Sequence, residues 1–121
     1  MVKPTPPTLR ERNRYIVLEL ASGRELERDD VVKSVWNTIL RLLGEWGSGE
    51  TGFYLMDWDK KANRGIVRVN HKSAGKIRAA LILIGDVNKT PVRPRIHGIS
   101  GTLKKARTRW MNPDFLMNKQ Q

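Results

Sequence analysis

The residues of this chain that could perform acid–base or metal chemistry are few, and their spacing is poor. Asp57 and Asp59 are two residues apart, so on a strand both carboxylates would point to one face and could share a metal ion; more often such a pair ends a strand and faces water. His71 and His97 lack the spacing of a metal site, and neither has a Ser or an acid at a motif position. The chain has no cysteine, which excludes thiolate zinc sites, disulfides and Cys nucleophiles. The sequence therefore predicts no catalytic residue, no metal ligand and no cofactor bound by the chain itself.

Basic side chains, by contrast, are concentrated in one half of the chain. Residues 60–121 hold fifteen Lys or Arg against two acids, a net charge of +13, whereas residues 1–59 have a net charge of −2. A half that almost lacks acids predicts a polyanionic partner, and we expect RNA; the alternative is a set of solvated charges that keep the protein soluble. On charge alone, the predicted RNA-binding positions are Lys72, Lys76, Arg93, Arg95, Lys104, Lys105, Arg107 and Arg109.

Gly98 and Gly101 bracket a tight turn that leads into a helix beginning near Thr102. The N-terminus of a helix can receive a phosphate group through its free backbone N–H groups. The turn lacks the spacing and the Lys-Ser/Thr pair of a P-loop, so a turn followed by a helix cap is the favoured interpretation. A phosphate contact at this point stays open as the alternative.

Apolar periodicity divides the chain into the strands and helices that would position these residues. Period-two alternation over residues 14–21 predicts a strand, and Asp29 or Asp30 is expected to be the N-cap of the helix that follows, which Gly44 and Gly47 end. The later elements are a hairpin of strands 53–59 and 66–70 with a turn at Asn63 and Gly65 at its exit, a helix capped by Ser73 and ended by Gly85, an irregular segment 88–94, an edge strand 96–100, and a last helix capped by Thr102 with Pro113 beyond it.

This order predicts an α+β fold of the ferredoxin-like, or RRM-like, split βαβ type (βαββαβ) with an extra C-terminal helix. The first two strands carry apolar residues on both faces, so we expect the last helix to cover the second face of the sheet. Residues 14–112 form one predicted RNA-binding domain, preceded by a flexible Pro-rich basic leader at residues 1–13 and followed by a tail at residues 113–121.

RNA-recognition modules of this fold carry aromatic residues on the third strand, on which bases stack. The corresponding stretch here is RGIVRV at residues 64–69, which has the Arg-Gly opening but neither aromatic residue. We therefore expect contacts to phosphate and 2′-OH groups, which recognise the shape of the RNA and not its base sequence.

Four aromatic residues suggest a second kind of surface. Trp46 lies among glycines, and together with Phe53, Tyr54 and Trp58 it is predicted to form an apolar patch for a protein partner. Burial in the chain's own core is the alternative. The longest apolar run, residues 79–84, is far too short to span a bilayer, and the N-terminal residues do not form a signal peptide, so no membrane association and a cytoplasmic location are expected.

Taken together, these features resemble archaeal ribonuclease P protein component 2, of the Pop-five-type subunit family that archaea share with eukaryotes. The resemblance covers roughly residues 10–112. The stretches that carry it are RYIVLE at residues 14–19, RGIVRV at residues 64–69 and IHGISGTLK at residues 96–104.

The resemblance implies a non-catalytic protein subunit of the ribonucleoprotein endonuclease that removes 5′ leaders from precursor tRNA. The RNA subunit performs the hydrolysis with bound Mg²⁺. The implied partners are ribonuclease P RNA, the TIM-barrel-like protein component 3, precursor tRNA through the holoenzyme, and a second copy of the chain within a heterotetramer. At positions that match the motifs, the resemblance points to Arg14, Arg68, Thr102 and Lys104 as RNA-binding residues.

Two other functions compete with this interpretation. A standalone RNA-binding module, such as a ribosome-associated protein, would need no protein partner. An acylphosphatase-like hydrolase of similar fold would need an Arg and an Asn at a phosphate-binding loop after the first strand, and that loop is missing.

Overall fold

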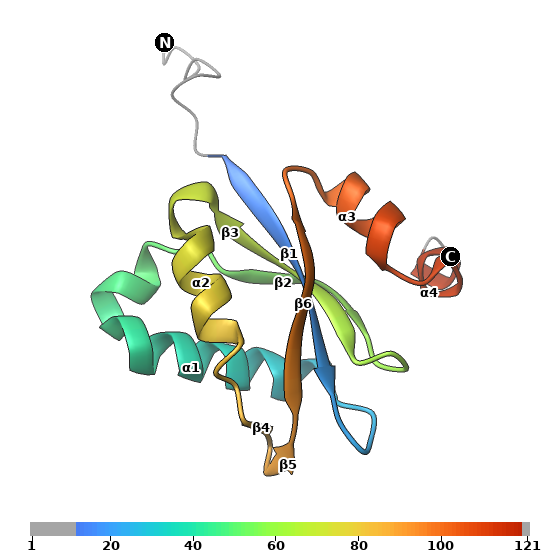
Figure 1. Cartoon of the computed structure of the whole chain (residues 1–121), viewed down its shortest axis with the longest axis horizontal. Coiled ribbons are helices and arrows are strands. Elements are labelled where there is room, and N and C mark those ends of the chain that lie inside the picture. Colours follow the sequence, from blue (N-terminus) through green and yellow to red (C-terminus); the bar gives the residue numbers. More distant parts are fainter. Residues whose placement is uncertain (1–11, 120–121) are drawn as a thin grey trace.

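The computed structural model describes residues 12–119, so residues 1–11 of the predicted leader lie outside the described residues (Figure 1). In chain order the elements are β1 (Asn13–Ala21), α1 (Arg28–Gly49), β2 (Tyr54–Asp59), β3 (Arg64–Asn70), the short 3₁₀ helix η1 (His71–Ser73), α2 (Ala74–Leu81), β4 (Asp86–Val87), β5 (Thr90–Pro91), β6 (Arg93–Ser100), α3 (Leu103–Trp110) and α4 (Pro113–Lys119).

The four long strands form one antiparallel sheet in the order β2-β3-β1-β6. This order, with α1 and α2 on one face, is that of the ferredoxin-like fold, and the predicted fold class is confirmed (Figure 1). β6 is an edge strand, as predicted. It tolerates Pro94 because an edge strand can lose one ladder hydrogen bond without breaking the sheet.

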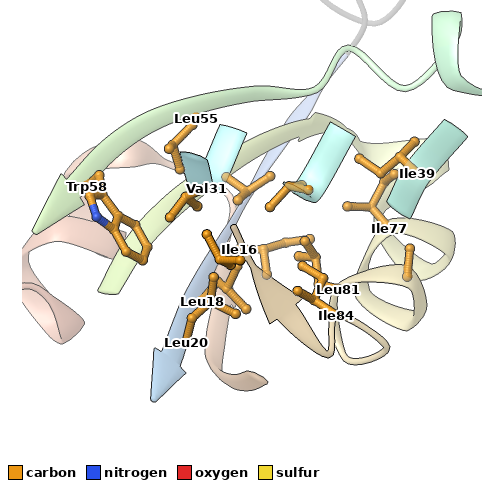
Figure 2. Close-up of a cluster of buried hydrophobic side chains, with 14 of the residues drawn as sticks. Ile16, Leu18, Leu20, Val31, Ile39, Leu55, Trp58, Ile77, Leu81 and Ile84 are labelled. Atoms are coloured by element: carbon orange, nitrogen blue, oxygen red, sulfur yellow. The ribbon is translucent and has the colours of Figure 1, made fainter. Parts of the chain in front are cut away.

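The main core lies between the sheet and helices α1 and α2 (Figure 2). Even-numbered residues of β1 supply its centre, since side chains alternate along a strand. Each fully buried aliphatic side chain contributes about 1.5–3 kcal/mol. The fully buried members are Ile16, Leu18 and Leu20 of β1, Val31, Val35 and Ile39 of α1, Val67 and Val69 of β3, Ile77 and Leu81 of α2, and Val87 of β4.

A second, smaller core lies on the opposite face of the sheet, beneath α3 and α4. Val17 of β1 and Ile66 of β3 are fully buried there, against Ala106 of α3 and Met111. Figure 1 shows α3 and α4 on the far side of the sheet from α1 and α2. The prediction that the C-terminal helix covers the second face is confirmed.

The start of α1 differs from the prediction. Its N-cap is Glu27, whose backbone carbonyl accepts from Val31 N, so the assignment of Asp29 or Asp30 as the cap is wrong. The helix begins early because Trp58 Nε1 donates to the carbonyl of Leu26 at 2.8 Å and fixes the chain there. Asp29 and Asp30 lie in the first turn, where each carboxylate stabilises the positive end of the helix dipole by about 0.3–1 kcal/mol.

α1 is kinked at Gly44 and does not end there. Gly44 has φ 74° and ψ 173°, which an L side chain rarely adopts, and the chain then resumes helical conformation to Gly49. The predicted end at Gly44 is therefore correct only for the first part of the helix. Gly65, expected at the exit of the turn, lies inside β3, which begins one residue earlier at Arg64. An added Cβ at position 65 would overlap the Asp57 carbonyl and the Trp58 ring, so the close approach of β2 requires glycine there.

Three further boundaries were predicted wrongly. Ser73 makes no cap bond; Asn70 accepts from Ser73 N at 2.9 Å, because a 3₁₀ turn precedes α2. Residues 86–91 form a small hairpin, and the supposed tail contains α4, which begins at Pro113 where a missing N–H costs nothing. No helix within residues 12–119 is long and apolar enough to cross a membrane.

Candidate nucleic-acid interface

An ion pair holds α3 against the second face of the sheet. Arg107 Nε donates to Asp57 Oδ2 at 2.7 Å, and a terminal nitrogen of the same guanidinium donates to Asp57 Oδ1 at 3.0 Å. The Asp57 carboxylate is fully buried, and its hydrogen bond raises the pKa of Arg107. Residues 103, 106, 107 and 110 share one face of the helix, so Arg107 points at the sheet. Arg107, predicted on charge alone to bind RNA, is instead paired with the sheet.

A close contact between Gly98 of β6 and Trp110 of α3 completes the docking. The Trp110 ring occupies the space that a side chain at position 98 would need, since an added Cβ would overlap the ring. The turn formed by Gly98 and Gly101 was identified from the sequence, but the role of Gly98 in admitting Trp110 was not.

Behind Trp110, a partly buried network joins three strands to the last turn of α3. Arg64 donates to Glu19 Oε1 at 2.8 Å and to the Trp110 carbonyl at 2.8 Å, and His97 Nε2 lies 2.8 Å from the same Glu19 oxygen. The Arg64 hydrogen bond is the main reason that the pKa of Glu19 is lowered. His97, whose spacing from His71 does not suit a metal site, belongs to this network. Period-two alternation of β1 was the one sequence signal that placed Glu19 on this face.

With its inner face so occupied, α3 presents cations on its outer face. Lys104, Lys105 and Arg109 are exposed, and the Arg109 guanidinium lies 5.4 Å from the centre of the Trp110 ring. Thr102 Oγ1 accepts from Lys105 N at 3.2 Å, so the interpretation of a turn followed by a cap is confirmed.

The structure gathers basic residues of the predicted RNA-binding set at one end of the sheet, where β1 begins and β3 and β6 end. The first turns of α2 and α3 lie at this end, on opposite faces (Figure 1). The Arg14 guanidinium lies beside the turn at Gly101, just before α3. We name this surface the basic end; it consists of Arg14, Lys72, Lys76, Lys104 and Lys105.

Not every predicted position belongs to the basic end. Arg93 and Arg95 are exposed at the start of β6, the opposite end of that strand. Arg68 lies over the ring of Tyr54, its cross-strand neighbour, at 5.4 Å from the ring centre. The basic residues therefore divide into separate groups and do not form one continuous face.

The predicted aromatic patch is only partly exposed. Trp58 is 8% exposed and donates to the Leu26 carbonyl, so its assignment to a partner surface is wrong: its strand position faces the main core. Phe53 is half-buried and stacks on Trp36, with ring centres 5.9 Å apart. Tyr54 is exposed. The side chain of Trp46 lies outside the described residues.

No group of three or more His, Cys, Asp or Glu residues within residues 12–119 is arranged to hold a metal ion. Asp57 and Asp59 do lie on one face of β2, as their spacing predicted, since they pair with Ile66 and Arg64 of β3. The carboxylate of Asp57 is bound by Arg107.

Fold and surface together define a class: a ferredoxin-like domain whose second sheet face is closed by a C-terminal helix and whose basic side chains lie around the end of the sheet. The chain belongs to the Rpp14/Pop5 family, whose model matches residues 14–111. The resemblance drawn from the sequence is thus confirmed.

Similar proteins agree with this assignment. The chain is 36% identical over 109 residues to "Ribonuclease P protein component 2" of Thermococcus kodakarensis. The aligned residues make up 90% of this chain and 91% of that relative. The protein of the same name from Pyrococcus abyssi is 36% identical over 111 residues, covering 92% and 94%. The protein of the same name from Methanococcus maripaludis is 36% identical over 112 residues, which make up 93% of this chain and 85% of that relative. These relatives give no support to a standalone RNA-binding module.

The fold also matches a chain in the cryo-EM structure of yeast ribonuclease MRP, with a TM-score of 0.67. The match covers 98% of this chain and 91% of that chain at 18% sequence identity. At this identity the likeness establishes a shared fold.

Proposed function

We propose that the chain is a protein subunit of ribonuclease P that binds and supports the catalytic RNA during removal of the 5′ leader from precursor tRNA. The observation that carries the proposal is the basic end, presented by a domain whose family is that of ribonuclease P protein component 2. The chain supplies no catalytic residue in this proposal. The RNA hydrolyses the phosphodiester bond with Mg²⁺ at its own active site.

The basic end supports RNA binding by charge and not by base stacking. Its five cations come from three elements and η1, so they can meet phosphates of two neighbouring backbone segments. Each such contact releases counterions and contributes to affinity in a salt-dependent way. Without the protein, Mg²⁺ has to reduce the repulsion between phosphates when RNA segments come close together. We infer that the chain lowers the Mg²⁺ concentration at which the RNA is active.

The proposal includes protein and RNA partners. They are ribonuclease P RNA, protein component 3, precursor tRNA through the holoenzyme, and a second copy of the chain within a heterotetramer, all in the cytoplasm. A protein partner is supported by the exposed aliphatic side chains of Ile82 and Leu83. Phosphate contacts to RNA would use the basic residues and would leave these two side chains without a partner.

The test is precursor-tRNA cleavage by the RNA subunit with component 3 over a Mg²⁺ series, with and without the full chain. We expect the chain to shift the half-maximal Mg²⁺ concentration downward. A variant with Lys72, Lys76, Lys104 and Lys105 replaced by Ala is expected to lose the shift. Unchanged Mg²⁺ dependence with the wild-type chain would contradict the proposal.

A further inference from the structure

A groove of about 410 Å³ lies between α2 and the edge strand β6. Its apolar wall is formed by Ala79 and Ile82 on one side and by Pro94 and Ile96 on the other. Ile82 is 54% exposed and its neighbour Leu83 is 62% exposed. Two adjacent aliphatic side chains with this exposure, beside a groove, are typical of an interaction surface.

The backbone at this groove is also accessible. Among the described strands β6 pairs only with β1, so one side of β6 is a free sheet edge. On the opposite wall, a Cβ added at Gly75 would meet no heavy atom within 4 Å, so α2 leaves room for a partner to approach closely. A partner can therefore contact both side chains and backbone here.

Charge restricts what can occupy the groove. Arg78 and Arg95 line it, and no acidic residue is among its lining residues in the described part of the chain. A second copy of this chain, bound with the same surface, would place these cations against each other. An RNA strand would match the cations, but it offers nothing to the aliphatic side chains of Ile82 and Ile96. A protein segment that has aliphatic side chains flanked by Asp or Glu satisfies both.

We propose that the α2–β6 groove is the docking site for such an acidic, aliphatic segment of a protein partner. This inference rests on the proposed function, because the ribonucleoprotein supplies the partner. It places that partner on the side of the sheet with α2 and not at the predicted aromatic patch around Phe53 and Tyr54. The partner's aliphatic side chains would pack on Ile82 and Ile96, and its carboxylates would lie beside Arg78 and Arg95.

The experiment titrates the full chain separately with protein component 3 and with ribonuclease P RNA, by calorimetry. Ile82→Asp places a carboxylate where the partner is acidic, and Arg78→Glu reverses a lining charge. Each is expected to weaken binding of component 3 by about tenfold or more, the scale of an interface hot spot. Ile82→Asp is expected to change RNA affinity by less than about twofold, since it removes no RNA-facing cation.

Met117→Asp is the matched control, because Met117 is 65% exposed on α4, on the other side of the sheet (Figure 1). It is expected to bind component 3 as the wild type does. Circular dichroism and thermal melting check that each variant folds. If Ile82→Asp does not fold, Arg78→Glu alone tests binding of component 3.

Three outcomes would overturn the inference. Wild-type affinity of both groove variants for component 3 would overturn the docking site and leave the proposed function standing. A decrease in the RNA affinity of Ile82→Asp, equal to its decrease in component 3 affinity, would assign the groove to RNA. Failure of component 3 to bind the wild-type chain would overturn both the inference and the proposed partner.

Discussion

Arg107 and Asp57 lie fifty residues apart in the chain and form a two-pronged ion pair that joins the last long helix to an edge strand. The Asp57 carboxylate is fully buried, whereas the Arg107 side chain is 32% exposed. A carboxylate in this position depends on its cation, since removing one member of a buried pair leaves the other charge without compensation.

Replacing Arg107 with Ala is therefore expected to lower the free energy of unfolding by about 2–3 kcal/mol, below the 3–5 kcal/mol of a wholly buried pair because the guanidinium is partly exposed. Urea unfolding measures the change. Arg109→Ala is the control on the same helix and is expected to cost less than about 0.5 kcal/mol. If the two variants were equally stable, the ion pair would not hold α3.

Gly98→Ala is expected to destabilise the protein by about 1–3 kcal/mol, because the new methyl group overlaps the Trp110 ring and forces the indole to move. Near-ultraviolet circular dichroism and urea unfolding report the displaced indole and its cost. Adding Trp110→Leu to the Gly98→Ala variant should recover part of the stability relative to Trp110→Leu alone. Gly85→Ala, where an added Cβ meets nothing within 4 Å, is the control.

The lowered pKa of Glu19 predicts a specific pH dependence. Hydrogen bonding to Arg64 keeps the carboxylate ionised in the folded state, so its contribution to stability is present above the ordinary pKa of 4.5. That contribution is lost as the pH falls below 4.5 and through the folded-state pKa. Urea unfolding at pH 7 and at steps below 4.5 should show a smaller decrease for Glu19→Gln than for the wild type. Parallel curves for the two proteins would contradict the prediction.

Replacing both Lys104 and Lys105 with Ala is expected to weaken binding of ribonuclease P RNA. The slope of log K against log salt should become less steep by about 0.7–0.9 for each phosphate that the two lysines no longer neutralise. Lys33→Ala with Arg41→Ala removes the same charge from α1, away from the basic end, and should leave the slope near that of the wild type. Equal slopes for the two double variants would place the RNA elsewhere.

The hairpin between β4 and β5 turns through Asn88 and Lys89, both with positive φ (48° and 67°). A two-residue turn of this kind favours Gly at its second position, and Lys has a steric cost there. Lys89→Gly is therefore expected to raise the free energy of unfolding by about 0.5–1 kcal/mol, as measured in urea. A decrease in stability would show that the Lys89 side chain contributes more than its backbone costs.

Much of this architecture follows from local pattern. The alternation of Ile16, Val17 and Leu18 predicted a strand with two apolar faces, and hence a helix on each side. Boundaries were harder, because they depend on contacts made far along the chain. The start of α1, for example, is set by Trp58, which lies 32 residues from Leu26 in the chain.

The charge pattern predicted the RNA-binding residues, and the packing of α3 and β2 showed which assignments were wrong. Composition identified the basic half, and the missing aromatic residues on β3 predicted phosphate contacts. Sequence could not separate Arg107 from Lys105, since only the register of α3 against Asp57 distinguishes a cation paired with the sheet from an exposed one. Trp58 was misjudged for the same reason: its exposure depends on which face of β2 the bulge near Met56 presents.

α3 and α4 follow all the strands in the chain, and this order has a consequence for biosynthesis. Val17 and Ile66, central to the second sheet face, are made long before the residues that bury them at 103–116. While the protein is being synthesised, a sheet assembled from the earlier strands would show a bare apolar face until residues 103–116 leave the ribosome. That interval, and not the mature protein, is when the molecule is most prone to aggregate.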